Sequence, residues 1–123
     1  MLEFGFVSRD QICELGTNGH NNYERLYAQI IGGLEPGHRL ILVTPYDGRP
    51  NANGSVVTKT AEYIRSLDGI YPFITIADWA AIIGEQPGLL AGDRVHLGGQ
   101  EAMSLYTDCV AEALAEASTG SVK

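Results

Sequence analysis

A continuous apolar run near the middle of this 123-residue chain limits its fold more than any other feature. Residues 40–43 read Leu-Ile-Leu-Val, without a polar residue among them, between Arg39 and Thr44. A strand with one solvated face alternates apolar and polar residues, whereas a strand of a parallel sheet is covered on both faces. We therefore expect Arg39–Thr44 to be a strand of a parallel sheet with helices on both sides.

The neighbouring segments predict strands and helices in alternation. Apolar residues recur at helical spacing in residues 23–34, 56–67 and about 99–117. Two short runs, Gln11–Leu15 and Phe73–Ala77, predict the remaining strands. The connections between the three strands are long enough for parallel pairing. The expected fold class is therefore α/β, with residues 1–123 forming one domain.

Composition narrows the classes of function. Eight Lys and Arg residues stand against fifteen Asp and Glu residues, giving a formal net charge of −7, and the basic residues are scattered. A nucleic-acid surface needs clustered basic residues, so we expect no nucleic-acid partner. No apolar run reaches the ~18 residues of a membrane span, and residues 1–7 do not resemble a signal peptide. Cys13 and Cys109 have apolar neighbours and are expected to be buried free thiols.

Polar residues follow each predicted strand. In an open α/β sheet, binding sites form at the carboxyl ends of the strands, and these ends share one rim. Four segments are therefore expected to converge: Gly16-Thr17-Asn18, Thr44-Pro45-Tyr46, Asp78-Trp79 and Asp93-Arg94-Val95-His96. Trp79 and Tyr46 could line a sugar or acyl pocket, or they could pack at the strand ends. Asp78 could instead cap the short helix that follows it.

Asp93 and His96 form the candidate catalytic pair. Three residues apart on a turn, the carboxylate can accept a hydrogen bond from one imidazole nitrogen and leave the other free to take a proton. The alternative is a helix-capping Asp beside a surface His. The Asn18 amide could donate to an oxyanion, or Asn18 could serve only as a turn residue. No spacing typical of a metal site or a nucleotide loop occurs, so we expect no metal and no cofactor.

Together, these segments resemble the SGNH (GDSL-like) hydrolase and acyltransferase family, and most closely the soluble C-terminal domain of bacterial cell-wall O-acetyltransferases. The residues that carry the resemblance are Glu14-Leu15-Gly16-Thr17-Asn18-Gly19, Ile41-Leu42-Val43-Thr44, Ile76-Ala77-Asp78-Trp79 and Asp93-Arg94-Val95-His96-Leu97. The resemblance implies a flavodoxin-like three-layer parallel sheet, truncated here to about three strands with flanking helices. It also implies a location on the outer side of the membrane, if the domain derives from a membrane acyltransferase.

The resemblance further implies roles for individual residues. Asn18 would match the oxyanion asparagine, His96 the catalytic histidine and Asp93 the carboxylate that orients it. The family's serine nucleophile, in a Gly-Asp-Ser turn, has no counterpart, since Ser8 lacks both that context and a predicted strand before it. The implied reaction is O-acetyl transfer to or from a carbohydrate by a Ser-His-Asp mechanism, with a small-molecule acyl donor. We expect the isolated chain to be inactive, because a base needs a nucleophile within reach.

A shortened sheet also affects the expected partners. Without the family's first two strands, the strand at Gln11–Leu15 would expose an apolar edge. Exposed edges pair with other strands, so we expect a homo-oligomer or a complementing N-terminal segment there. Two alternatives to an enzyme remain open: a non-catalytic binding module of the same fold, and an unrelated flavodoxin-like nucleotide binder. Residues 118–123 are expected to fray.

Overall fold

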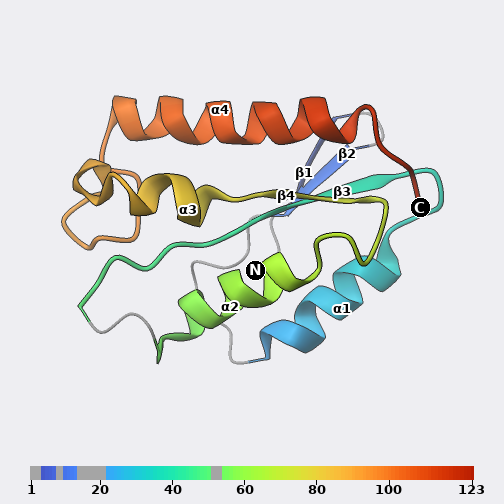
Figure 1. The fold of residues 1–123 in the computed structure, drawn as a ribbon, viewed down its shortest axis with the longest axis horizontal. Helices are drawn as coiled ribbons and strands as arrows, with labels where there is room; N and C mark the ends of the chain where they lie inside the picture. Colours follow the sequence, from blue (N-terminus) through green and yellow to red (C-terminus); the bar gives the residue numbers. More distant parts are fainter. Residues whose placement is uncertain (1–3, 8–9, 14–21, 51–53) are drawn as a thin grey trace.

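A sheet sandwiched between two layers of helices forms the centre of the computed structural model, which describes residues 4–7, 10–13, 22–50 and 54–123 (Figure 1). Within these residues the sheet has four strands: β1 (Phe4–Val7), β2 (Asp10–Cys13), β3 (Arg39–Val43) and β4 (Ile74–Ala77). They lie in the order β1-β2-β3-β4, with β2, β3 and β4 parallel and β1 antiparallel to β2. The α-helices are α1 (Tyr23–Gly33), α2 (Val56–Ser66), α3 (Trp79–Gly84) and α4 (Gln100–Ala117).

The apolar run of β3 explains the two helical layers. Leu40 and Leu42 face a core that contains residues of α1 and α2, whereas Ile41 and Val43 face a core that contains residues of α3 and α4. All four side chains are buried. A strand covered on both faces has no need of polar residues in alternate positions, which is the pattern observed in the sequence. The predicted α/β class, with helices on both sides of parallel strands, is confirmed.

The predicted helices are present, with small differences at their ends. The helical spacing of residues 99–117 predicts that six residues of α4 face the core, and three of these are buried: Ala102, Cys109 and Ala113. The other three are only half-buried: Tyr106, Val110 and Leu114. Both cysteines are buried, as predicted, and neither forms a disulfide. Within the described ranges, no helix combines the length and the apolarity that crossing a membrane requires.

Strand β1 was not predicted, and it changes two expectations about the N-terminal region. Phe4 pairs with Cys13 and Val7 with Asp10, so β1 covers the edge of β2 that we expected to be exposed. The expectation of an exposed edge is therefore wrong. Strand β1 was missed because the segment Phe4-Gly5-Phe6-Val7 is too short and irregular to show a strand pattern in the sequence. Ser8 therefore does follow a strand, although Ser8 itself lies outside the described residues. Because β1 is antiparallel, its end lies at the amino end of β2, away from the rim where the candidate site was expected.

The expectation that residues 118–123 fray is also wrong. The backbone N–H of Lys123 donates to the carbonyl of His38 at 2.9 Å, and the N–H of Gly37 donates to the carbonyl of Lys123 at 2.9 Å. The Lys123 ammonium reaches the carbonyl of Ile31 in the last turn of α1, at 2.8 Å. A cation at a helix C-terminus satisfies carbonyls that have no partner within the helix. Fixing the C-terminus requires contacts with residues far away in the sequence, which no local pattern reveals.

Candidate active site

The carboxyl ends of β3 and β4 lie side by side, because Val43 pairs with Ala77. The next residues, Thr44 and Asp78, are joined by a hydrogen bond from Thr44 Oγ1 to Asp78 Oδ1 at 2.8 Å. Thr44 is fully buried and also accepts a hydrogen bond from the N–H of Ala80 at 3.0 Å. Thr44 therefore fixes the start of α3 relative to the sheet.

Asp78 caps α3, which was one of its two predicted roles. Its carboxylate accepts hydrogen bonds from the N–H of Ala81 at 3.4 Å and from Arg65 Nε and Nη2, each at 2.9 Å. Burial raises the pKa of Asp78, but the hydrogen bonds from Arg65 and Thr44 outweigh it and lower the pKa below its ordinary value. These contacts use both carboxylate oxygens, so the structure gives Asp78 a structural role.

The aromatic residues at this rim pack into the core. Trp79 is buried and meets the ring of Tyr106 edge-on, with ring centroids 5.1 Å apart. Tyr46 is half-buried against the core on the α4 side of the sheet. Of the two predictions made for Trp79, packing at the strand end is therefore the correct one.

Asp93 and His96 lie on a tight turn between α3 and α4, as the sequence predicted. The turn is closed by the N–H of Ala91, which donates to the carbonyl of His96 at 2.8 Å, and by an isolated bridge between Leu90 and Leu97. Asp93 Oδ1 accepts hydrogen bonds from the backbone N–H groups of Val95 at 3.0 Å and His96 at 3.1 Å. Its other oxygen, Oδ2, lies 2.5 Å from His96 Nδ1. The pair postulated from the sequence is thus present in the fold.

The Asp93 carboxylate determines which ring nitrogen of the neutral His96 imidazole carries the proton. The hydrogen bond with His96 and those from the N–H groups of Val95 and His96 hold the pKa of Asp93 far below its ordinary value. An ionised carboxylate can only accept, so Nδ1 of His96 is the protonated nitrogen and Nε2 keeps a free lone pair. The His96 side chain is 69% exposed, so Nε2 is accessible to a reacting hydroxyl group. This geometry is that of a general base with its orienting partner.

A second charged pair, which sequence reasoning missed, lies in the loop that follows β3. Asp47 accepts hydrogen bonds from Arg49 Nε at 2.8 Å and Nη2 at 2.7 Å. The Asp47 side chain is only 1% exposed, whereas that of Arg49 is 57% exposed. The N–H of Gly48, between them, donates to the carbonyl of Arg94 at 2.9 Å. The only sequence signal was a Tyr-Asp-Gly-Arg turn after a strand.

The Asp47–Arg49 pair predicts a specific pH dependence of stability. Hydrogen bonds from Arg49 lower the pKa of Asp47 from 3.8 to about 2. A carboxyl group with a lowered pKa in the folded state stabilises the fold above its unfolded pKa, and this contribution is lost as the pH falls through the folded value. We therefore expect the free energy of unfolding to fall more steeply between about pH 4 and about pH 2 in the wild type than in Asp47→Asn. Urea unfolding at a series of pH values measures the two slopes.

Asp68→Asn is the control for this experiment, because Asp68 is exposed. It should keep the wild-type slope. An Asp47→Asn variant that unfolds with the wild-type pH dependence would show that Asp47 contributes no proton-linked stability.

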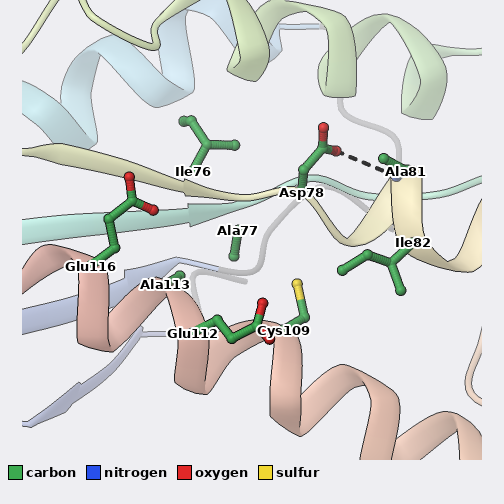
Figure 2. Close-up of a pocket in the computed structure, with 9 residues that line it drawn as sticks. All are labelled: Ile76, Ala77, Asp78, Ala81, Ile82, Cys109, Glu112, Ala113 and Glu116. Carbon is green, nitrogen blue, oxygen red and sulfur yellow. Dashed lines mark hydrogen bonds between the residues drawn. The ribbon is translucent and has the colours of Figure 1, made fainter.

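A separate cavity of about 210 Å³ lies between α4 and the end of β4 (Figure 2). Figure 2 shows Cys109 of α4 and Asp78 on opposite sides of it, with the carboxylates of Glu112 and Glu116 along α4. Burial raises the pKa of the Cys109 thiol, as do the charges of Glu112 and Asp78, so this thiol is a weak nucleophile. Neither Asp93 nor His96 lines the cavity.

The remaining predicted site residue, Asn18, lies outside the described residues. Its convergence with Asp93 and His96 stays a prediction. As to metals, the ranges described contain no cluster of three or more His, Cys, Asp or Glu side chains suited to an ion.

Comparison with known proteins shows which solved structure this chain is similar to. No protein-family model matches the chain, and no curated protein matches it. Among solved structures, the chain is similar to the C-terminal catalytic domain of peptidoglycan O-acetyltransferase A (OatA) from Streptococcus pneumoniae, in a structure with a methylsulfonyl adduct. The two are 38% identical, with a TM-score of 0.83 over 91% of this chain and 66% of that chain.

This likeness confirms the family inferred from the four sequence segments. The chain belongs to the SGNH-like hydrolase and acyltransferase family. It spans slightly less than two thirds of the pneumococcal chain, so about a third of that domain has no counterpart in these 123 residues.

Proposed function

We propose that this chain is the part of an SGNH-type O-acyltransferase or esterase that supplies the general base. The observation that carries the proposal is the 2.5 Å contact between His96 Nδ1 and Asp93 Oδ2, which leaves Nε2 of an exposed imidazole free to accept a proton. Similarity to a domain named as a peptidoglycan O-acetyltransferase supports an acyl donor and a carbohydrate acceptor as substrates.

In the proposed reaction, His96 Nε2 takes the proton of a serine hydroxyl as the serine oxygen attacks the carbonyl carbon of the acyl donor. Asn18 donates its side-chain N–H to the resulting oxyanion. The intermediate collapses to an acyl-serine, and the imidazolium gives its proton to the leaving group. His96 then deprotonates the acceptor hydroxyl, whose oxygen attacks the acyl-serine. The bond to the serine oxygen breaks, and the imidazolium returns its proton to that oxygen, which releases the ester and the free serine. Water in place of the acceptor gives hydrolysis.

The serine is proposed to come from polypeptide outside these 123 residues. The sequence contains no Gly-Asp-Ser turn, and a third of the pneumococcal domain is not covered by it. The serine-bearing polypeptide would be either a covalently linked segment or a separate partner chain of different sequence that adds to the sheet edge. Since β1 covers β2, a strand added at that edge would pair with β1.

Complementation tests this proposal. We expect the 123-residue chain to hydrolyse p-nitrophenyl acetate no faster than buffer does. A fusion of this chain to the part of the pneumococcal domain that it does not cover should gain esterase activity. That activity should be lost when the serine of the added segment is replaced by alanine.

Two results would contradict the proposal. One is activity of the 123-residue chain equal to that of the fusion, because the nucleophile would then lie within the chain. The other is a folded fusion without activity, which would favour the non-catalytic binding module. Circular dichroism and gel filtration establish that the fusion is folded.

A further inference from the structure

The loop after β3 and the turn that carries Asp93 and His96 are separated by more than forty residues in the sequence, yet they are hydrogen-bonded to each other. The bond joins the N–H of Gly48 to the carbonyl of Arg94 at 2.9 Å. We propose that Asp47 and Gly48 are positioning residues for the Asp93–His96 pair, an inference that rests on the proposed function of that pair.

Asp47 makes the loop a rigid support. Its buried carboxylate accepts three hydrogen bonds from Arg49: from the backbone N–H at 3.1 Å, from Nε at 2.8 Å and from Nη2 at 2.7 Å. A bidentate ion pair of this kind fixes both the distance and the relative orientation of the carboxylate and the guanidinium. Hydrogen bonds to Asp47 and the charge of Asp47 raise the pKa of Arg49, and the charge of Asp93 adds to this effect. The guanidinium therefore lies within electrostatic range of the candidate site.

Gly48 places this support in direct contact with the turn. A Cβ atom at position 48 would lie 2.8 Å from the Arg94 carbonyl oxygen and 2.9 Å from an edge carbon of the Tyr46 ring. Both distances are shorter than Cβ atoms tolerate, so an alanine here would displace either the turn or the ring. Glycine is thus required by close approach of two backbones.

The turn needs such support because its backbone is strained. Arg94 has φ of 62°, in the left-handed region that residues other than glycine rarely adopt. Such a conformation persists only where the surrounding structure holds it in place. The Gly48 hydrogen bond holds Arg94 from one side, and Asp93 Oδ1 holds the following N–H groups of Val95 and His96. Asp93 immediately precedes this residue, so a movement of Arg94 would carry the carboxylate away from the imidazole.

Substitution of Gly48 by alanine tests the inference. The first readout is the tautomer of the neutral His96 ring in the 123-residue chain, measured by ¹⁵N NMR through the carbon-bound ring protons. We expect the form protonated at Nδ1 to predominate in the wild type, and a mixture of tautomers in Gly48→Ala. Gly54→Ala and Gly92→Ala are matched controls, because a Cβ at either position meets no atom within 4 Å. Both controls should retain the wild-type tautomer.

The second readout is kinetic and uses the active fusion. Misplacement of a catalytic group by about 1 Å can lower the rate by up to about 10²-fold. We expect Gly48→Ala to lower kcat for p-nitrophenyl acetate by about 10- to 100-fold with KM unchanged. Asp47→Asn, which keeps the side-chain volume, should also lower kcat. If Gly48→Ala does not fold, Asp47→Asn is the variant that tests the inference.

Folded Gly48→Ala and Asp47→Asn variants with wild-type tautomer and wild-type kcat would overturn the inference. A changed tautomer with an unchanged kcat would contradict the proposed function instead, because the pair would be coupled to the loop without taking part in the reaction. A rise in KM alone would also overturn the positioning role, since it would indicate a loss of substrate binding.

Discussion

Replacing His96 with alanine is expected to lower kcat of the active fusion by about 10³–10⁴-fold, because the imidazole nitrogen that takes the serine proton is then missing. Asp93→Asn should have a loss of similar size. An amide at position 93 can donate a hydrogen bond to Nδ1, so the proton of the neutral ring would move to Nε2, where a lone pair is needed. Both variants should leave KM close to the wild-type value. Initial rates of p-nitrophenyl acetate hydrolysis over a range of substrate concentrations measure these changes.

His38→Ala is the matched control for this prediction. His38 is the other histidine in the described part of the chain, and its Nδ1 lies 3.3 Å from the carbonyl oxygen of Glu35 at the entry to β3. It should retain wild-type kcat. Equal rates for His96→Ala and the wild type would remove His96 from the reaction.

Leu42→Ala is expected to have the largest effect on stability. Leu42 is fully buried in β3 and contributes to the core on the α1 and α2 side of the sheet. Truncation of such a side chain removes its transfer free energy and leaves a cavity, which costs about 2–5 kcal/mol. A domain of this size has only about 5–15 kcal/mol of stability in total, so the variant should lose a large fraction of its free energy of unfolding. Urea unfolding followed by circular dichroism measures the difference.

Met103→Ala is the control for Leu42→Ala, because the Met103 side chain on α4 is 56% exposed. Its free energy of unfolding should change by no more than about 0.5 kcal/mol. A loss below about 1 kcal/mol for Leu42→Ala would mean that β3 is not covered on both faces as described.

Local sequence patterns predicted most of the fold, because the spacing of apolar residues reflects which faces of a helix or strand are buried. The apolar run of β3 indicated two covered faces, and the helical spacing of α1, α2 and α4 located these helices to within a residue or two. Strand β1 was missed because four residues with a glycine among them carry no clear period. The attachment of Lys123 to Gly37 and His38 was missed because it depends on residues far apart in the chain.

The candidate site was likewise predicted only in part, because only its local contacts follow from sequence spacing. Asp93 and His96 are three residues apart, so their hydrogen bond is a local property that sequence spacing can suggest. The contact between Gly48 and Arg94 exists only because the carboxyl ends of the strands meet at one rim. The roles of Asp93, His96 and Asn18 in catalysis stay predictions until activity is measured.

Labelling with methylsulfonyl fluoride tests whether His96 activates the serine. An activated serine oxygen attacks the sulfur, fluoride leaves, and the base accepts the serine proton. We predict that the fusion gains one methylsulfonyl group on its serine, and that His96→Gln reacts about 10³-fold more slowly, as shown by mass spectrometry over time. Labelling of His96→Gln at the wild-type rate would exclude His96 as the base, because the serine would then be activated without this imidazole.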